Sequence, residues 1–378
     1  MKKIIYRNLA TDCVKFFLLT IFTISTIIWV LQAVNYLDFV IEDGHGFFVY
    51  FNFTLLSFPK ILSRIYPFAV FLSFSYILLK YEDKNELLIF WNFGIKKIHL
   101  INFFIKVSFL FVIFSLLLNA LIVPTAQDKA RSFIRSSDLD FFESALKPKT
   151  FVDIVKNLTI YYDRKNENGE LENMFLNDKS SPNESQTTIA KTGKFEIRGD
   201  KKILVLYNGK TINNVNRKTS EFNFSKTDFN ISNFSTQTVT HQKTQETSTK
   251  ELVLCLLIIN NFKKDIGNKI KSELNNCTLV NMINIYKEIY SRLIKPIYIT
   301  LLISISLLLI LKSKSDPTFN TQKIKTYSLG FLSIIFIESS SKFISNNLIQ
   351  NSFLSVLPLV LILMIYFYFL ITMKVKKI

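Results

Sequence analysis

The sequence contains few of the residues that build metal sites and disulfide frameworks. Only 3 cysteines and 3 histidines occur in 378 residues, and they lie far apart, without the spacing of metal ligands. Neither a zinc site nor a disulfide framework is therefore indicated. We expect Cys13, Cys255 and Cys277 to be free thiols, with a single Cys255–Cys277 bond as the alternative.

Common enzyme motifs are also missing. No Gly-x-x-x-x-Gly-Lys-Ser/Thr motif for ATP binding occurs anywhere in the sequence. The segment 125–290 contains no Ser-His-Asp set and no paired carboxylates. The chain is therefore not expected to be an enzyme or to need a cofactor. Any ATP hydrolysis that drives it must take place on a separate subunit.

Apolar side chains and lysine are abundant instead. The chain is 49% hydrophobic and 14% aromatic, with 37 phenylalanines against 9 glycines, and its formal net charge is +17. Such a charge can indicate nucleic-acid binding, but the joint abundance of Asn, Ile and Lys is what AT-rich coding produces. We therefore expect no nucleic-acid partner, and we expect the apolar residues to lie in a membrane.

Six apolar windows are long enough to cross a membrane as helices, which takes about 20 residues. They lie near residues 14–36, 56–79, 100–123, 293–312, 326–349 and 353–373. Lysine and arginine gather near both termini and in the loops 80–99 and 312–325, and they are absent from the short loops on the other side. Because basic loops stay in the cytoplasm, both termini are predicted to be cytoplasmic. Residues 125–290 are then predicted to face outward.

The outward segment has the pattern of a β domain. Alternating runs such as Leu158–Tyr162 and Ile203–Tyr207 are separated by turn signals, among them Asn168-Gly169 and Asn208-Gly209. This pattern predicts an antiparallel sandwich or jelly roll. The predicted domains are three transmembrane helices over 1–124, an inserted all-β, jelly-roll-like domain over 125–290, and three further transmembrane helices over 291–378.

The loop after the second window predicts a short amphipathic helix over 82–94. Asp83 and Glu86 have the spacing of a capping box, and Gly94 suits the left-handed position just after a helix. The predicted apolar face consists of Leu87, Phe90 and Trp91. One interpretation is a coupling helix that docks on a soluble partner. The other is that Glu86 merely caps a helix that lies against the membrane surface.

Ionisable residues occur in pairs inside or beside the apolar windows, where charge is costly. Lys60 and Arg64 lie four residues apart at the start of the second window, as do Glu338 and Lys342 in the fifth. The structural interpretation is snorkelling to headgroups for the first pair and an internal salt bridge for the second. The functional hypothesis is that Lys60, Arg64 and Lys342 line a cavity and hold the phosphates of a lipid.

These features together resemble the LptF/LptG family of permeases, along nearly the whole chain. Pro59 and Pro67 match two prolines at the start of the family's second span. Glu86, followed eight residues later by Gly94, matches the family's coupling-helix pattern, although Phe93 replaces the usual small residue.

Further motifs extend the resemblance. Glu288 and Arg292 match the family's Glu-x-x-x-Arg, and as a pair four residues apart they are expected to pin the helix where it leaves the β domain. The stretches Trp29–Gln32 and Ala190–Gly193 favour LptF over LptG. Ala33 and Asn35 depart from the pattern, because some members have basic side chains there.

The resemblance implies a permease subunit of an exporter that extracts lipopolysaccharide from the bacterial inner membrane. The implied partners are an LptG-like paralogue, an LptB-like ATPase dimer that Glu86 contacts, and an LptC/LptA-like bridge that receives lipid from the periplasmic β domain. The competing hypothesis is a membrane-anchored periplasmic scaffold or binding protein without transport activity.

Overall fold

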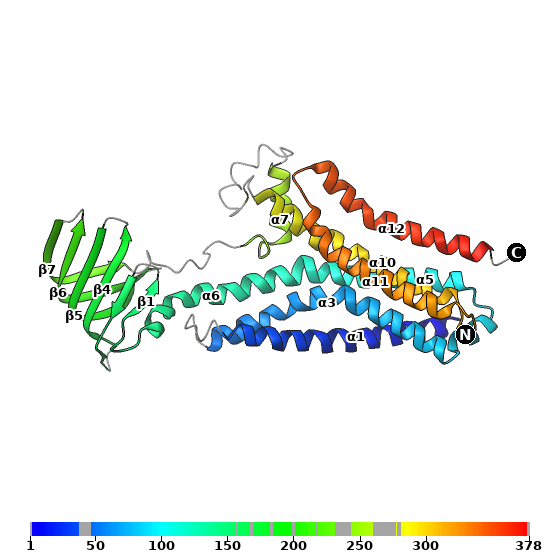
Figure 1. Cartoon of the computed structure of the whole chain (residues 1–378), viewed down its shortest axis with the longest axis horizontal. Helices are drawn as coiled ribbons and strands as arrows, with labels where there is room; N and C mark the ends of the chain where they lie inside the picture. The colour runs from blue at the N-terminus through cyan, green and yellow to red at the C-terminus, as the bar shows by residue number, and fades with distance from the viewer. Residues whose placement is uncertain are drawn as a thin grey trace. The chain divides into compact units, whose positions relative to one another are not determined.

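The computed structural model describes residues 2–37, 47–155, 158–166, 169–181, 184–198, 201–215, 218–230, 243–259, 277 and 281–375. The chain divides into two compact units. The first comprises Met1–Gln32, Leu56–Lys129 and His241–Ile378, and the second comprises Ala33–Leu55 and Ala130–Thr240. The first unit is helical, and the second carries a β-sheet (Figure 1).

The helices that precede the sheet extend beyond the apolar windows, α1 at its start and α3 at both ends. They are α1 (Lys2–Asn35), α3 (Phe47–Asp83), the short α4 (Glu86–Asn92), α5 (Lys97–Leu117), the π-helical turn η1 (Leu118–Ile122) and α6 (Val123–Ala145).

The helices that follow the sheet include more irregular turns. They are α7 (Thr249–Ile259), α9 (Met282–Ile289), the π-helical η4 (Tyr290–Ile294), the 3-10 turn η5 (Lys295–Ile297), α10 (Tyr298–Ser306), the 3-10 turn η6 (Leu307–Leu311), α11 (Phe319–Ser340), η7 (Ser341–Phe343) and α12 (Leu348–Val375).

Five helical runs among the described residues are long and apolar enough to cross a membrane: Ile4–Asn35, Phe47–Asp83, Lys97–Ile134, Met282–Leu311 and Ile349–Met373. The predicted fifth span corresponds to α11, which lies outside this set because its first turns carry Gln322, Lys323 and Lys325. This helix also ends at Ser340, well before the predicted residue 349. The predicted plan of membrane helices with an inserted β domain is confirmed.

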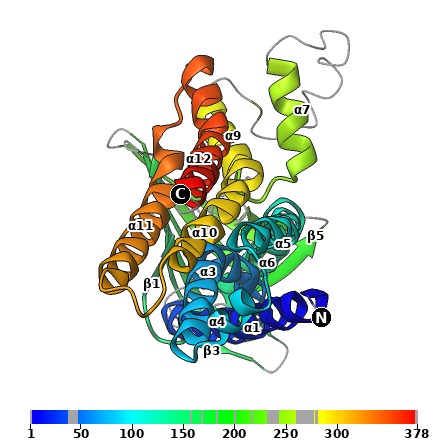
Figure 2. The same ribbon diagram turned by 90° about the vertical axis from the view of Figure 1, so that its right-hand side faces the viewer.

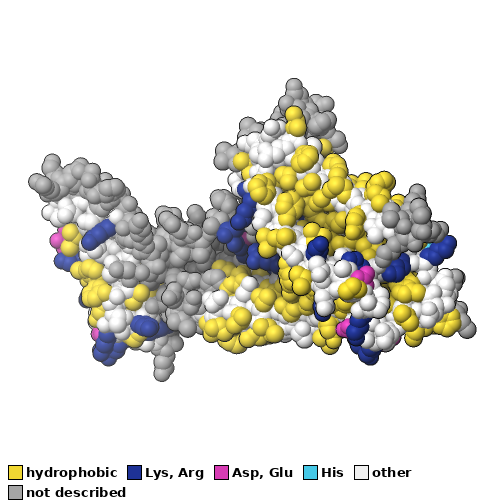
Figure 3. Space-filling model, turned by 45° about the vertical axis from the view of Figure 1, so that its right-hand side comes forward, with side chains coloured by type: hydrophobic (Ala, Val, Ile, Leu, Met, Phe, Trp, Pro, Cys, Tyr) yellow, Lys and Arg dark blue, Asp and Glu magenta, His cyan; other side chains and the backbone are white. Residues whose placement is uncertain are grey.

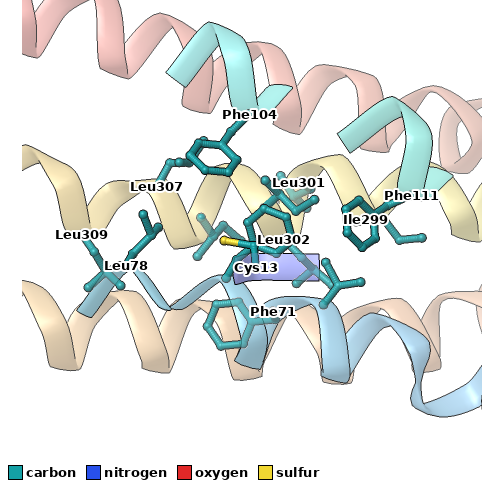
Figure 4. Close-up of a cluster of buried hydrophobic side chains, with 14 of the residues drawn as sticks. Cys13, Phe71, Leu78, Phe104, Phe111, Ile299, Leu301, Leu302, Leu307 and Leu309 are labelled. Atoms are coloured by element: carbon teal, nitrogen blue, oxygen red, sulfur yellow. The ribbon is translucent and has the colours of Figure 1, made fainter. Parts of the chain in front are cut away.

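The core of the helical unit is built around α10. Every residue from Tyr298 to Leu311 is buried, and α5, α11 and α12 all pack against this segment (Figure 2). In the close-up, Phe71 of α3 lies on one side of Leu302, and Phe104 and Phe111 of α5 lie on the other (Figure 4). The outer surface of the unit is also apolar, and hydrophobic side chains cover much of the face in Figure 3, as expected of helices that meet lipid.

Small polar side chains join the helices inside this core. Ser75 donates a hydrogen bond to Ser306 over 3.0 Å, and Ser108 donates one to Thr300 over 3.0 Å. Hydroxyl pairs of this kind are typical of membrane helices, where water does not compete for the bond. They fix how α3 and α5 lie along α10.

The second unit contains a single antiparallel sheet among its described residues. The strands are β1 (Val152–Val155), β2 (Leu158–Tyr161), β3 (Arg164–Lys165), β4 (Leu171–Ser181), β5 (Glu184–Arg198), β6 (Lys201–Val215) and β7 (Lys218–Asn230). Their order is β1-β2-β4-β5-β6-β7, with β3 paired to β4. The inserted antiparallel β domain is thus confirmed, although a second sheet of a jelly roll is not among the described residues.

One predicted turn is wrong. Asn208-Gly209 lies in the middle of β6, and Asn208 has a φ of 51° there. Gly209 pairs with Ala190 on one side and Phe224 on the other. A methyl at Gly209 would overlap the carbonyl oxygen of Ile189, so this glycine permits close strand approach and does not form a hairpin turn. Of the Asn168-Gly169 turn, only Gly169 lies within the described residues.

The expectation of three free thiols is also wrong. Cys255 of α7 and Cys277 form a disulfide, with their Cα atoms 5.8 Å apart, and Cys13 alone is free and buried. The two half-cystines meet because α7 packs against α9, where Leu252 and Ile285 share a small apolar cluster with them. Sequence spacing contains no information about that packing.

Candidate functional site

A polar cavity of about 310 Å³ lies among the helices of the first unit. Its lining comes from α3, α5, η1, α6, the turn before α7, α9, η4, η5, α10, α11 and η7. The lining residues are Lys60, Ser63, Arg64, Pro67, Ser115, Asn119, Val123, Gln127, Gln245, Glu288, Ser291, Lys295, Pro296, Ile299, Ile337, Glu338 and Ser341. We call this the basic cavity, because three of its side chains are cationic and two are acidic.

The structure brings together three of the four ionisable residues that the sequence analysis identified in or beside the apolar windows. Lys60 and Arg64 line the cavity from one face of α3, and Glu338 lines it from α11. Lys342 is exposed on η7 and is not among the lining residues. Proximity of the α3 and α11 side chains depends on helix packing, which the sequence pattern does not describe.

Lys295 is a cavity residue that the sequence reasoning missed. Its Nζ lies 3.2 Å from Oε2 of Glu338, so these two residues form an ion pair across the cavity. The structural interpretation predicted a salt bridge between Glu338 and Lys342 instead. The Lys295 side chain is 18% exposed and that of Glu338 is 53% exposed. The available signal was a lysine inside the predicted window 293–312, since charge in a span is costly.

The backbone around the cavity is irregular. Asn119 lies in the π-helical η1, Ser291 in the π-helical η4, and Lys295 and Pro296 in the 3-10 turn η5. Pro67 interrupts α3 in the same region, and its missing N–H leaves the carbonyl of Ser63 without a helical donor. Irregular backbone at membrane depth is tolerated where it lines a polar cavity, and π-helical turns often mark functional sites.

Pro59 also lies within α3. The structure therefore places both family-pattern prolines well inside the helix, which begins at Phe47, and not at its start. Pro67 lines the basic cavity, whereas Pro59 is not among its lining residues.

Arg292 holds the wall of the cavity together. Its side chain is only 2% exposed, and its Nε donates to Oε1 of Glu288 over 3.0 Å. Its Nη1 and Nη2 donate to the carbonyl oxygens of Gln245 and Thr247, in the turn before α7, and to the hydroxyl of Thr249, the first residue of α7. The predicted Glu288–Arg292 pair is thus present, and it fastens η4 to the chain that leads into α7.

The predicted short helix is present as α4, with a glycine end as expected. Gly94 has a φ of +71°, its N–H bonds the carbonyl of Trp91, and the N–H of Ile95 bonds the carbonyl of Phe90. These two bonds form a Schellman motif. The capping box is wrong, because α3 continues to Asp83 and the residue that precedes α4 is Asn85 in a left-handed conformation.

The predicted apolar face of α4 points into the protein. Leu87 and Phe90 are buried in the main helical core, and Trp91 is partly buried against it. The outward side of α4 is apolar as well, with Leu88, Ile89 and Phe93 each about half exposed. Glu86 occupies the first turn, where an acidic side chain is favoured by the helix dipole.

Two sets of bonds tie this region to the segment that follows α10. Lys97 lies over the Trp91 ring at 5.4 Å and donates to the carbonyls of Ile310 and Leu311, at the end of η6. Glu82, which is buried at the end of α3, accepts bonds from the Ser313 hydroxyl and the Lys314 N–H. Through Lys97 and Trp91, α4 is thus connected to the end of the helical run Met282–Leu311, which also carries Lys295.

The sheet of the second unit has a separate open hollow of about 650 Å³. Stacked and edge-on aromatic rings of Phe151, Tyr161 and Phe175 lie in it, with Ile189 and Lys210 beside them. Exposed apolar hollows of this kind mark interaction or ligand-binding surfaces.

Comparison with known proteins agrees with the family resemblance of the sequence. An uncharacterized protein of Rickettsia prowazekii (strain Madrid E) is 22% identical over 188 residues, which are 50% of this chain and 52% of that protein. The chain thus matches about half the length of that relative. The family model described as lipopolysaccharide export system permease LptF/LptG matches residues 7–372. Because this match covers nearly all of the chain, the protein belongs to the LptF/LptG family.

Proposed function

We propose that this protein is the LptF-type permease subunit of an ABC exporter that extracts lipopolysaccharide from the inner membrane. The observation that carries the proposal is the basic cavity, in which Lys60, Arg64 and Lys295 face a polar space among apolar helices. Charges at this depth are expensive unless they serve a ligand or a partner. A lipid with several phosphates is the ligand that matches a cavity lined by cations.

The ion pair inside the cavity suggests how the phosphate is received. Glu338 is about half exposed and belongs to α11, whereas Lys295 is held on η5 beside Pro296. An arriving phosphate competes with the carboxylate for the Lys295 ammonium group. Lys342, one turn beyond Glu338, then makes a further headgroup contact at the rim.

The energy for extraction comes from a separate ATPase dimer that docks on α4. Glu86 and Gly94 match the family's coupling pattern, and the exposed apolar residues Leu88, Ile89 and Phe93 offer a docking face on the outward side. On the buried side, Leu87 and Phe90 pack in the helical core, so movement of the ATPase against α4 displaces core residues. The bonds from Lys97 to the end of η6 relay this movement toward η5 and the basic cavity.

The extracted lipid leaves through the β domain. The aromatic hollow around Phe151, Tyr161 and Phe175 takes its acyl chains and passes them to an LptC/LptA-like periplasmic bridge. A second permease subunit of the LptG type completes the transmembrane part. Both termini lie in the cytoplasm, and the sheet lies in the periplasm.

The test is ATP-dependent release of lipopolysaccharide from proteoliposomes that contain the chain with its co-expressed subunits. Charge reversal of Lys60, Arg64 or Lys295 to glutamate should lower release at least about tenfold, equivalent to about 1.4 kcal/mol. Lys287→Glu, on α9 but outside the cavity lining, is the matched control and should leave release unchanged. Lys342→Glu should impair release without lowering protein abundance.

A second arm separates transport from the scaffold alternative. The purified chain should carry a P-loop ATPase, and replacement of Glu86 by Ala or deletion of 83–94 should remove it. A scaffold with passive spans requires no such subunit. Undiminished release from all three cavity variants, or purification without an ATPase under conditions that preserve the complex, would refute the proposal.

A further inference from the structure

A second cavity lies between α11 and α12, away from the basic cavity. Its volume is about 630 Å³, within the range of about 300–1,000 Å³ that is usual for small-molecule sites. It is lined by Leu308, Gln322, Ile324, Lys325, Thr326, Ser328, Leu329, Leu332, Met364, Ile365 and Tyr368. None of these residues lines the basic cavity. We call it the α11–α12 groove.

The groove exists because α11 and α12 both pack on α10 while they separate from each other. From the turn that joins them, the two helices diverge toward the start of α11 and the end of α12 (Figure 1). The floor is Leu308 of η6, and the side-chain amide of Gln322 bonds its carbonyl oxygen over 3.4 Å. This bond holds α11 at a fixed position on the floor of the groove.

The groove has a basic and hydrogen-bonding group of side chains toward one end and is mostly apolar toward the other. Gln322, Lys325 and Tyr368 lie toward the start of α11 and the end of α12. Leu329, Leu332 and Met364 lie further from those ends. A cationic and hydrogen-bonding end followed by an apolar trough is complementary to one lipid with an anionic headgroup.

The length of the groove indicates a lipid and not another membrane helix. On α11 the lining extends from Gln322 to Leu332, which is about 15 Å at about 1.5 Å per residue. The hydrocarbon core is about 30 Å thick, so the groove spans a single leaflet. A lipid chain fills such a groove along its whole length, whereas a spanning helix of a partner would extend well beyond it.

We infer that the α11–α12 groove binds an anionic glycerophospholipid of the cytoplasmic leaflet, with its phosphate at Lys325. The inference goes beyond the transport proposal and shares with it only the orientation that places the start of α11 at the cytoplasmic side. Basic pockets between spans on that side are suited to anionic headgroups. The bound lipid fills the wedge between α11 and α12 and so supports α11, the helix that presents Glu338 to the basic cavity.

The test uses the full chain with its co-purified subunits, stripped of lipid by detergent exchange and then titrated with lipid. The probes are phosphatidylglycerol and phosphatidylcholine with identical acyl chains, and native mass spectrometry reads the bound lipid. The wild type should bind phosphatidylglycerol about fivefold more tightly, as expected for one lysine near an anionic headgroup.

The variants locate the site. Lys325→Gln should abolish the preference, whereas Lys323→Gln, on the same helix but outside the lining, should keep it. Leu329→Trp should fill the trough and weaken binding of both lipids, which keeps the inference testable if Lys325→Gln fails to fold. Lys287→Gln, which lies outside the lining of both cavities, should leave phospholipid binding unchanged.

Three results would overturn the inference. One is equal binding of the two phospholipids by the wild type. Another is a preference that persists in Lys325→Gln. The third is capture of a protein subunit, and not of lipid, by a photocrosslinking amino acid placed at position 329.

Discussion

Arg292 joins three segments of the chain through one side chain. It is buried, it pairs with Glu288 on its own helix, and it bonds two carbonyls and one hydroxyl of residues 245–249. The hydroxyl of Thr249 in turn bonds the carbonyl of Ala120 in η1 over 2.5 Å. Two irregular helical turns of the cavity wall are therefore held by one guanidinium group and one threonine. Lysine cannot make the same set of bonds as Arg292, because an ammonium group lacks the planar arrangement of donors.

We expect Arg292→Ala to destabilise the protein by about 3–5 kcal/mol, because Glu288 then loses its partner and three acceptors lose their donor. Arg292→Lys should recover only part of the loss. Thermal unfolding of the purified chain in detergent measures both, with Lys287→Ala on α9 as the control that should unfold at the wild-type temperature. A wild-type melting temperature for Arg292→Ala would show that the bonds contribute nothing to stability.

Gly330 allows α11 to approach α3 closely. A methyl at this position would overlap the ring of Phe71, which is fully buried. Gly330→Ala should therefore cost about 1–3 kcal/mol by overpacking. Phe71→Leu should relieve the overlap, so that the double variant is more stable than the sum of the single changes predicts. Ser333→Ala on the same helix is the control, and additive effects in the thermal unfolding cycle would contradict the packing argument.

At the scale of elements, the end of α4 depends on one left-handed residue. Gly94 has open space around it, so a substitution there is limited by backbone conformation alone. Gly94→Ala should cost about 1–2 kcal/mol, Gly94→Asn less and Gly94→Val more. Hydrogen exchange at the amides of Gly94 and Ile95 measures the loss, since both belong to the Schellman motif. Equal exchange in all three variants would mean that the motif is not maintained by this residue.

The sequence located α4 more accurately than it described its ends and faces. The glycine end was predictable, because left-handed geometry selects glycine at that position. The start was not, because the pattern does not reveal that α3 continues to Asp83. The apolar residues Leu87 and Phe90 were found, but which side of an all-round apolar helix is buried depends on the neighbouring helices.

The same limit explains the errors in the sheet and in α11. Asn-Gly is the commonest hairpin signal, yet Asn208 and Gly209 serve a long strand in which neighbouring backbones lie close. The predicted window for α11 is apolar on average as far as residue 349, but it contains Ser339, Ser340 and Ser341, and the helix ends at Ser340. At Asn208-Gly209, strand packing overrides the local preference for a turn. At the end of α11, averaging hydropathy over the whole window hides the effect of the three serines.

At the scale of the whole molecule, the chain is a multi-pass inner-membrane protein of the permease type. Continuous apolar runs predicted the five helical runs that are long and apolar enough to cross a membrane, because lipid surrounds a span on all sides, and alternating residues predicted the β insertion. The candidate site was only partly predictable. Lys60 and Arg64 share one helix and were found as a pair, whereas Lys295 meets Glu338 across 43 positions of sequence, through packing alone.

The disulfide tests the predicted topology independently of the lysine pattern. Cys255 and Cys277 close a loop of 22 residues, which stabilises a folded domain by about 3 kcal/mol in the chain-entropy model. Such bonds persist in the periplasm and are rare in the cytosol. If the segment after the sheet faces outward, the bond forms in growing cells, and a mass-tagged maleimide finds no thiol in the Cys13→Ser variant after denaturation.

The same variant should take up two tags after reduction, and two without reduction in a strain that lacks the periplasmic thiol oxidase. A cytoplasmic location would give two tags in every strain, because both thiols would stay reduced. The result bears on the site as well, since α7 follows the turn that Arg292 holds against the basic cavity. Loss of the bond should therefore lower the melting temperature and leave the Lys295–Glu338 pair in place, whereas loss of Arg292 should disturb both.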